Sequence, residues 1–428
     1  MNDQGRPAGV PFRLAGMMFL QYAALGAWIV TLSSWLVQPA GQGGLGFSSQ
    51  QTAFLYATQA IGGLVAPFIT GLLADRFFAS EKLVGTMHLF MAGSMVGIGQ
   101  VAKSFAGENA NPPVACLYLF FALLGYSIAS VFAITVGNSM AMRTLANPQK
   151  SFGPVRSMGT LGWIVSSNVV ERFFRLQSED LFAVSAACHV ILGLLAWKLP
   201  HTPPKGRGRP IPEVMGLPAM KLFRDPSFIV FAAVAFLIQM MQQFYTVFAT
   251  PYLLDLGMAN PVAKLSLAQF VEMGCMASLS FMVVRFGLKT TMIVGLLAWV
   301  LRNSVLMGGN IPAITAVAIP MHGVSYTFFS IVAALYIDKE APPHLRAGAQ
   351  ALLTFVAGGP GTLLGFFLGG WVKDAHTHGP TTDWPAVWLV PVVGCTVATI
   401  VFIVFFHEPK VPQPADGTPT PELLPENP

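Results

Sequence analysis

Long apolar runs are the feature that most limits what this chain can fold into. A membrane-crossing helix needs about 20 apolar residues. On that measure the sequence predicts twelve spans, near residues 14–36, 52–74, 83–103, 114–137, 154–170, 182–199, 227–249, 265–284, 290–308, 311–336, 348–370 and 386–406. Charged residues make up only 10% of the chain, against roughly 25% in soluble domains. The sequence therefore predicts an all-α polytopic membrane protein.

The basic residues predict how the chain is oriented in the membrane. They gather in alternate loops, most densely between Lys198 and Arg224, while the other loops hold few of them. Loops rich in Lys and Arg stay on the cytoplasmic side. We therefore expect a multi-pass protein of the cytoplasmic (inner) membrane with both termini in the cytoplasm. The net charge of +5 follows from this pattern and does not indicate a nucleic-acid partner.

The longest polar inner segment divides the predicted spans six and six. We expect an N-terminal six-helix bundle over residues 1–200, a cytoplasmic linker over 201–224 and a C-terminal six-helix bundle over 225–407, followed by a Pro-rich, disordered tail over 408–428. The segment GLLADR at 71–76 resembles the loop motif of the major facilitator superfamily. Two six-helix halves around a central cavity are the architecture of that superfamily, with substrate sites near the bilayer midplane.

Glu272 is the first candidate for a functional residue. It is the only acidic residue that lies well inside a predicted span, and Gln269 lies three residues earlier on the same helical face. A carboxylate at that depth costs on the order of 2.5 kcal/mol or more, so it normally faces a cavity lined by protein or water. Glu272 is thus a candidate proton carrier. The alternative is a structural carboxyl group bonded to a neighbouring helix.

The fifth predicted span carries a second polar stripe. Arg156, Thr160 and Trp163 recur at i, i+4 and i+7, so they share one helical face. An arginine, a hydroxyl and a large ring on one face suit a planar polar ligand. The alternative places Arg156 at the cytoplasmic end, where it snorkels to the interface or pairs with Asp75.

Polar residues also interrupt the seventh and tenth spans. The seventh holds a set of amides and a hydroxyl at helical spacing: Gln239, Gln242, Gln243 and Thr246. Such groups are costly in an apolar helix unless they meet partners, which favours a cavity lining over helix-to-helix contacts alone. In the tenth span, His322 and Tyr326 share a face, and His322 is a second candidate for a titrating group, although a lone histidine is more often a packing residue.

Two further features need partners or flexibility. Arg302 lies deep in the ninth span, and the sequence alone does not identify its partner. Gly358-Gly-Pro360-Gly in the eleventh span predicts a bent or loosened helix.

The sequence lacks the signatures of enzymes and of metal or cofactor sites. It contains no phosphate-cradling Gly-Lys-Ser loop, no HExxH and no GxSxG. Its four cysteines have no paired spacing, so neither a disulfide nor a metal site is expected. We expect neither a cofactor nor an enzyme.

At several of these residues the sequence resembles the nucleoside:proton symporter family of the major facilitator superfamily. The resemblance rests on FLQYAALGAWIVTL in the first span, VRSMGTLGW in the fifth, QFVE in the eighth, LAWVLRN in the ninth, LRAGAQ opening the eleventh and TTDWPAVWLV opening the twelfth. It implies the major facilitator fold and a site in which six residues hold base and ribose: Arg156, Thr160, Trp163, Gln243, Gln269 and Glu272.

Three positions depart from typical bacterial members of that family. Thr246 stands where they have an asparagine, and Thr327 stands where they have an acidic residue implicated in coupling. His322 replaces an aromatic residue. With Thr246, His322 and Tyr326, the predicted substrate site comprises nine residues, and Glu272 and His322 are the candidates for proton coupling.

The expected function is a secondary active transporter that imports nucleosides of the uridine or adenosine class by proton symport with alternating access. The protein is expected to act as a monomer in the lipid bilayer. The alternatives are a nucleoside facilitator without proton coupling, a permease for another polar solute such as a sugar, and a polytopic receptor or membrane enzyme.

Overall fold

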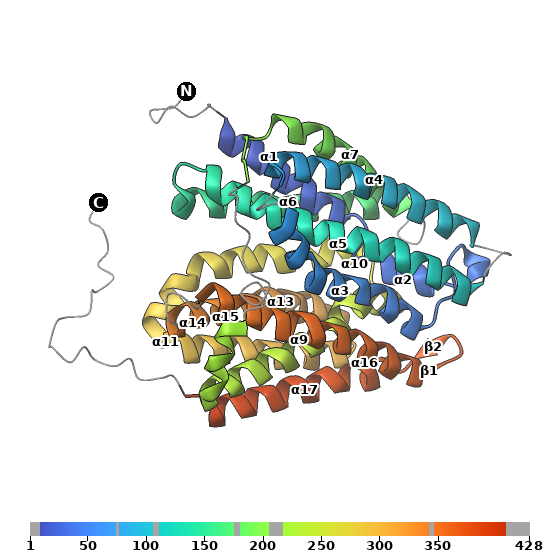
Figure 1. The fold of residues 1–428 in the computed structure, drawn as a ribbon. Coiled ribbons are helices and arrows are strands. Elements are labelled where there is room, and N and C mark those ends of the chain that lie inside the picture. Colours follow the sequence, from blue (N-terminus) through green and yellow to red (C-terminus); the bar gives the residue numbers. More distant parts are fainter. Residues whose placement is uncertain are drawn as a thin grey trace.

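Two groups of helices lie side by side in the protein (Figure 1). The computed structural model describes residues 9–73, 77–105, 111–174, 180–204, 217–341 and 346–407. Asp75 and Arg76 of the 71–76 motif, part of the expected linker and the expected tail at 408–428 lie outside the described residues.

The first group contains the helices of the N-terminal half. They are α1 (Val10–Gly26), α2 (Leu32–Val37), α3 (Ser49–Leu73), α4 (Ser80–Ser104), α5 (Pro112–Thr144), α6 (Pro148–Phe173) and α7 (Asp180–Leu195), with the short 3₁₀ turns η1 (Ala40–Gln42) and η3 (Ala196–Lys198). Helix α1 packs on α6, α3 on α5 and α4 on both α5 and α7.

The second group contains the helices of the C-terminal half. It begins with η4 (Leu217–Arg224), α9 (Pro226–Asp255), α10 (Pro261–Leu265), α11 (Leu267–Met307), α12 (Ile311–Ala313), η5 (Ile314–Ala318) and α13 (Ile319–Ser325). It continues with η6 (Tyr326–Ile331), α14 (Val332–Glu340), α15 (Arg346–Leu353), η7 (Thr354–Gly361), α16 (Thr362–Ala375), the hairpin β1 (Thr377–His378) and β2 (Thr381–Thr382), and α17 (Trp384–Phe405).

Each of the twelve predicted ranges falls on helix, with local differences. The first range is two helices, because the backbone tightens to i→i+3 hydrogen bonds at Trp28 and Thr31. The ranges 265–284 and 290–308 run on as α11, which is interrupted at Gly287, a glycine with φ of 80°. The expected bend near Pro360 is the π-helical turn η7, since proline has no N–H for the α-helical ladder.

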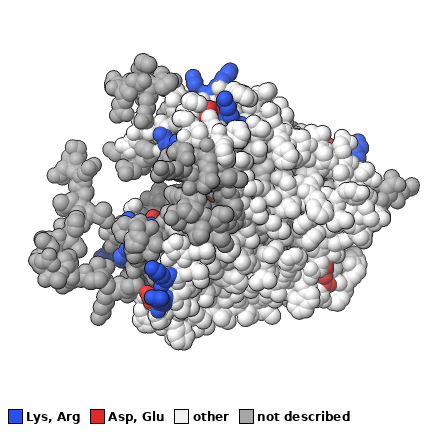
Figure 2. Space-filling view, in the orientation of Figure 1, with Lys and Arg blue, Asp and Glu red and all other residues white. Residues whose placement is uncertain are grey.

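Hydropathy and surface agree with a membrane protein. Seven stretches of the described residues are long and apolar enough to cross a bilayer: Pro112–Thr144, Asp180–Lys198, Pro226–Asp255, Pro261–Met307, Ile311–Lys339, Gly348–Ala375 and Trp384–Phe405. On the visible face, Lys, Arg, Asp and Glu lie towards the ends of the molecule, and a broad uncharged region separates them (Figure 2).

Glycines bring helices α1 and α6 into backbone contact. A Cβ added at Gly162 would lie 2.1 Å from the Phe19 carbonyl oxygen, and one added at Gly26 would lie 2.7 Å from the Trp163 carbonyl oxygen. Small residues permit this approach in membrane helices, where packing rather than the hydrophobic effect drives association. The contact fixes the face that α6 turns towards the second group.

The two halves are joined at one end of the molecule by reciprocal carboxylate caps. Asp374 of α16 accepts from the N–H groups of Ser49 (2.8 Å) and Gln50 (2.9 Å) at the start of α3. Glu171 of α6 accepts from the N–H groups of Val262 (2.8 Å) and Ala263 (2.7 Å) in α10. Carboxylates at helix N-termini satisfy free donors and interact favourably with the helix dipole. Each half therefore caps a helix of the other.

We predict that removing both cap charges separates the halves at this end. In Glu171→Gln/Asp374→Asn, spin labels at the exposed positions 42 and 378 should show a second, longer distance population. A loss of about 1–2 kcal/mol corresponds to a roughly 5- to 30-fold larger open population. Asp383→Asn is the control, because Asp383 caps only its own helix through Ala386 N–H. Identical distance distributions for the double variant and the wild type would contradict the prediction.

Candidate functional site

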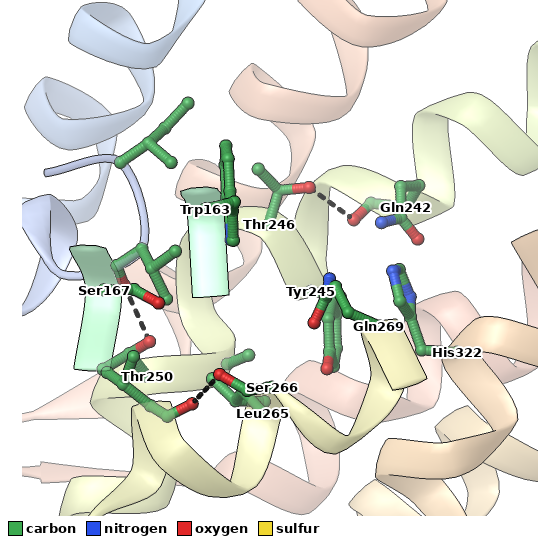
Figure 3. Close-up of a pocket in the computed structure, with 14 residues that line it drawn as sticks. Trp163, Ser167, Gln242, Tyr245, Thr246, Thr250, Leu265, Ser266, Gln269 and His322 are labelled. Carbon is green, nitrogen blue, oxygen red and sulfur yellow. Dashed lines mark hydrogen bonds between the residues drawn. The ribbon is translucent and has the colours of Figure 1, made fainter. Parts of the chain in front are cut away.

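Two adjoining pockets lie between the halves, each with a volume of about 210 Å³. Four residues line both pockets, so the two are neighbouring chambers between the halves: Trp163, Gln242, Gln269 and His322. Figure 3 shows the chamber that contains Tyr245 and Thr246. In it Trp163 lies on one side, and Gln242 and His322 lie together on another side. The site draws on both groups of helices.

The first chamber holds the charged residues. Helices α1 and α6 supply Tyr22, Arg156, Thr160 and Trp163, while α9, α11, α13 and η6 supply Gln242, Gln269, Glu272, His322 and Tyr326. This chamber brings a guanidinium and a carboxylate, from opposite halves, to one cavity.

Arg156 is held against the ring of Tyr22. Its guanidinium carbon lies 4.0 Å from the ring centroid, a cation–π contact. Gly159, one turn along α6, makes room for this pair, since an added Cβ would lie 2.7 Å from Tyr22 Cδ2 and 2.9 Å from Arg156 Nη1. The expected alternative partner Asp75 lies outside the described residues. Arg156 thus lines the chamber, with one face of its guanidinium on the ring.

Glu272 lies where α11 meets α13 at backbone distance. A Cβ added at Gly323 would lie 2.4 Å from the Glu272 amide nitrogen, so the two helices touch there. No hydrogen bond or ion pair joins the Glu272 carboxylate to the described residues, although it interacts electrostatically with Arg156. The carboxylate is therefore free to meet a ligand or a proton.

The second chamber is lined mainly by α9 and by the junction of α10 and α11. It includes Tyr245, Thr246 and Ser266, together with the four shared residues. Two bonds between the halves border it: Asn168 Nδ2 donates to Ser266 Oγ (2.9 Å), and Thr250 Oγ1 donates to the Val30 carbonyl oxygen (2.7 Å). These bonds tie α6 and the Val30 turn to the second half.

The structure brings eight of the nine predicted site residues into this cavity: Arg156, Thr160, Trp163, Thr246, Gln269, Glu272, His322 and Tyr326. The ninth, Gln243, does not line it. Gln243 is buried, its Nε2 donates to the Gln239 carbonyl oxygen (2.9 Å), and it packs at Gly365 of α16. A helix turns by about 100° per residue, so the neighbouring Gln242 faces the cavity instead.

Two aromatic residues of the site were not predicted. Tyr22 and Tyr245 line the chambers. Tyr22 follows the polar residue Gln21 in the sequence, and Tyr245 precedes the predicted Thr246. Gln21 itself is buried against Gly137, and Trp28 donates from Nε1 to Tyr126 Oη (3.3 Å) in the core of the first half. Choosing between adjacent residues needs the rotation of the helix, which hydropathy does not give for a helix that is apolar all round.

Arg302, the cation whose partner was unknown, lies directly behind the cavity wall. It is fully buried and has its guanidinium between two rings, with the carbon 4.1 Å from the Trp299 centroid and 4.4 Å from the Tyr245 centroid. Its Nη1 lies 3.2 Å from Gln242 Oε1 and 2.8 Å from His322 Nδ1. Aromatic faces and neutral acceptors therefore stabilise this charge.

Comparison with known proteins identifies the family of this chain. The family described as nucleoside H⁺ symporters matches residues 8–411. The chain belongs to the nucleoside H⁺ symporter family. It is similar to the candidate nucleoside transporter YegT of Escherichia coli, with 32% identity over 92% of this chain and 93% of that protein. It is also similar to the xanthosine permease of Escherichia coli, with 28% identity over 94% of this chain and 97% of that protein.

Solved structures establish the fold. The crystal structure of the nucleoside transporter NupG superposes with a TM-score of 0.81 at 24% identity and covers 93% of this chain and 99% of that one. The D-xylose–proton symporter superposes with a TM-score of 0.66 at 15% identity, over 93% and 97% of the two chains. The predicted all-helical major facilitator fold is confirmed, as is the prediction of a multi-pass membrane transporter of this family rather than an enzyme.

We predict that Gly159→Ala weakens ligand binding by displacing Tyr22 and Arg156. A desolvated cation–π contact contributes about 1–2 kcal/mol, so the apparent affinity for a nucleoside should fall roughly 5- to 30-fold, measured by competition against radiolabelled uridine. Gly153→Ala on the same helix is the matched control, because nothing lies within 4 Å of its added Cβ. Equal affinities for the two variants would exclude Gly159 from this role.

Proposed function

We propose that this protein imports nucleosides across the cytoplasmic membrane by proton symport, with alternating exposure of the cavity between its halves. Residues 1–200 and 225–407 are the two moving bundles, and residues 201–224 link them. Transporters of this architecture bind substrate near the midplane, between the repeats. The observation that carries the proposal is the cavity in which Arg156 of one half and Glu272 of the other face a common space.

The lining suits a nucleoside better than an apolar solute. Trp163 and Tyr326 provide aromatic faces for a planar base, and Gln242, Gln269 and Thr160 provide hydrogen-bonding groups for its edge and for ribose hydroxyls. Family membership and the names of the relatives support the same substrate class. Ligands of the uridine or adenosine class are thus the first to test.

Glu272 is the better of the two candidates for the proton site. His322 Nδ1 lies 2.8 Å from Arg302 Nη1, and a guanidinium can only donate, so Nδ1 is an acceptor and the ring is neutral. A second proton on the His322 ring would place an imidazolium cation beside the Arg302 guanidinium. Among the described residues Glu272 has no such neighbour bonded to it, so its carboxylate is free to take up and release a proton.

The position that is acidic in typical family members takes no part in the cavity. Thr327 is fully buried in η6, and its hydroxyl has no partner among the described residues. We therefore assign proton coupling to Glu272. A facilitator without proton coupling remains the rival function, favoured by the threonine at this position.

The distribution of basic residues supports both termini in the cytoplasm. We propose a monomer as the transporting unit, because both halves that line the cavity belong to the same chain.

The decisive experiment is uptake of radiolabelled uridine and adenosine into proteoliposomes with and without an inward proton gradient. We expect saturable uptake that the gradient accelerates. Uptake that is independent of the gradient would establish a facilitator. The absence of saturable uptake for every nucleoside would rule out nucleosides as the substrate class. A sugar permease would instead be stabilised in thermal-shift assays by sugars and not by nucleosides.

A substitution tests the role of Glu272 directly. Glu272→Gln should abolish gradient-driven uptake, because the amide cannot exchange a proton at this position. Asp225→Asn is the control, since Asp225 caps α9 outside the cavity through Ser227 N–H (2.9 Å). Full gradient-driven uptake by Glu272→Gln would rule out the proposed coupling.

A further inference from the structure

Arg302 determines which hydrogen-bonding groups the cavity wall presents. It is completely buried, one layer behind the cavity, and no carboxylate among the described residues pairs with it. A buried cation of this kind orients the dipoles around it, because the local dielectric is low and every nearby acceptor turns towards it. Two of these acceptors belong to side chains of the cavity wall.

The first of these side chains is Gln242. Its Oε1 accepts from Arg302 Nη1 at 3.2 Å. Since Arg has no acceptor, the amide cannot be flipped, and its NH₂ group is the end left to face the cavity. Among the described residues nothing accepts a hydrogen bond from Gln242 Nε2. Gln242 is thus a free donor.

The second is His322. Its Nδ1 accepts from the same Nη1 at 2.8 Å, which leaves the neutral ring with its proton on Nε2. The ring is clamped in a stack, with Tyr245 at 4.9 Å and Tyr326 at 6.2 Å between centroids and interplanar angles of 16° and 20°. His322 therefore also presents a donor in a fixed orientation.

The two donors are adjacent. Both side chains bond to one nitrogen of Arg302, both line both chambers, and Figure 3 shows Gln242 and His322 next to each other at the cavity wall. Two converging N–H donors match the two lone pairs of one carbonyl oxygen. They do not match an exocyclic amino group, which is itself a donor and would leave both desolvated N–H groups unpaired.

We infer that Arg302 is a positioning residue that makes Gln242 and His322 a paired donor for an exocyclic oxygen of the base. The cavity therefore selects oxo-base nucleosides, such as uridine and inosine, over their amino counterparts cytidine and adenosine. This inference rests on the proposed function and names the substrate class within it.

The test compares matched ligand pairs as competitors of labelled uridine in binding and uptake. Uridine differs from cytidine, and inosine from adenosine, by an exocyclic oxygen in place of an amino group and by a proton on the adjacent ring nitrogen. We expect the oxo member of each pair to compete at least about tenfold more tightly, because one or more unpaired buried donors cost that much or more. Equal competition, or preference for the amino members, would overturn the inference.

Gln242→Glu tests the polarity of the wall without changing its shape. One carboxylate oxygen still accepts from Arg302, while the other presents an acceptor where the amide presented a donor. The uridine-to-cytidine ratio should fall by about tenfold or invert. Gln239→Glu is the matched control on the same helix, because Gln239 donates to Thr362 Oγ1 (3.0 Å) away from the cavity and should leave the ratio unchanged.

Arg302→Met tests the positioning role itself. Without the guanidinium, the Gln242 amide rotates and His322 exchanges tautomers, so the ratio should approach one even where overall affinity is retained. A purely structural role would lower the affinity for all four nucleosides equally and leave the ratio as in the wild type. If Arg302→Met does not fold, Gln242→Glu still decides. Failure of every nucleoside to bind to the wild-type protein would instead overturn the proposed function.

Discussion

The cost of an unpaired polar or charged group in an apolar interior governs this structure. In lipid, backbone groups must bond within their own segment, which is why the described chain is almost entirely helical. The same cost applies to side chains. Arg302 is buried between two rings and bonded to neutral acceptors, while no described residue is bonded to Glu272 at the cavity. The first arrangement stabilises a buried charge, although Arg302 Nε has no hydrogen-bond partner among the described residues, and the second keeps a charge available.

Close helix packing converts that constraint into a site. Gly26 and Gly162 let α1 and α6 touch, and Gly323 does the same for α13 and α11. Each contact holds a functional side chain, Trp163 in the first case and Glu272 in the second, at a fixed place on its helix. Polar side chains of both halves reach the cavity because these rigid pairs face each other across the boundary between the halves.

The boundary itself is closed at one end by carboxylates rather than by apolar packing alone. Glu171 and Asp374 each cap a helix of the opposite half. A carboxylate that caps a helix contributes about 1 kcal/mol, enough to favour one state and weak enough to be exchanged for bonds in another. Such a closure is compatible with the proposed alternating opening of the two ends.

The sequence by itself determined the helical membrane class, the positions of the apolar segments and most of the polar residues of the cavity. These follow from composition, from segment length and from spacings such as Arg156, Thr160 and Trp163, because a period of 3.6 residues is visible in one dimension. The family resemblance was likewise readable from short motifs, and the fold it implied is confirmed.

Only the tertiary structure decided which of two adjacent residues faces the cavity. Gln242 rather than Gln243 lies on the wall, and Tyr22 rather than Gln21, because the rotation of each helix is set by contacts with its neighbours. It also supplied the partners of Arg302, which lie 60 and 20 residues away in the chain. A buried cation shows in the sequence only as a group that needs partners. Which acceptors turn towards it, and so which donors face the ligand, depends on how three helices pack.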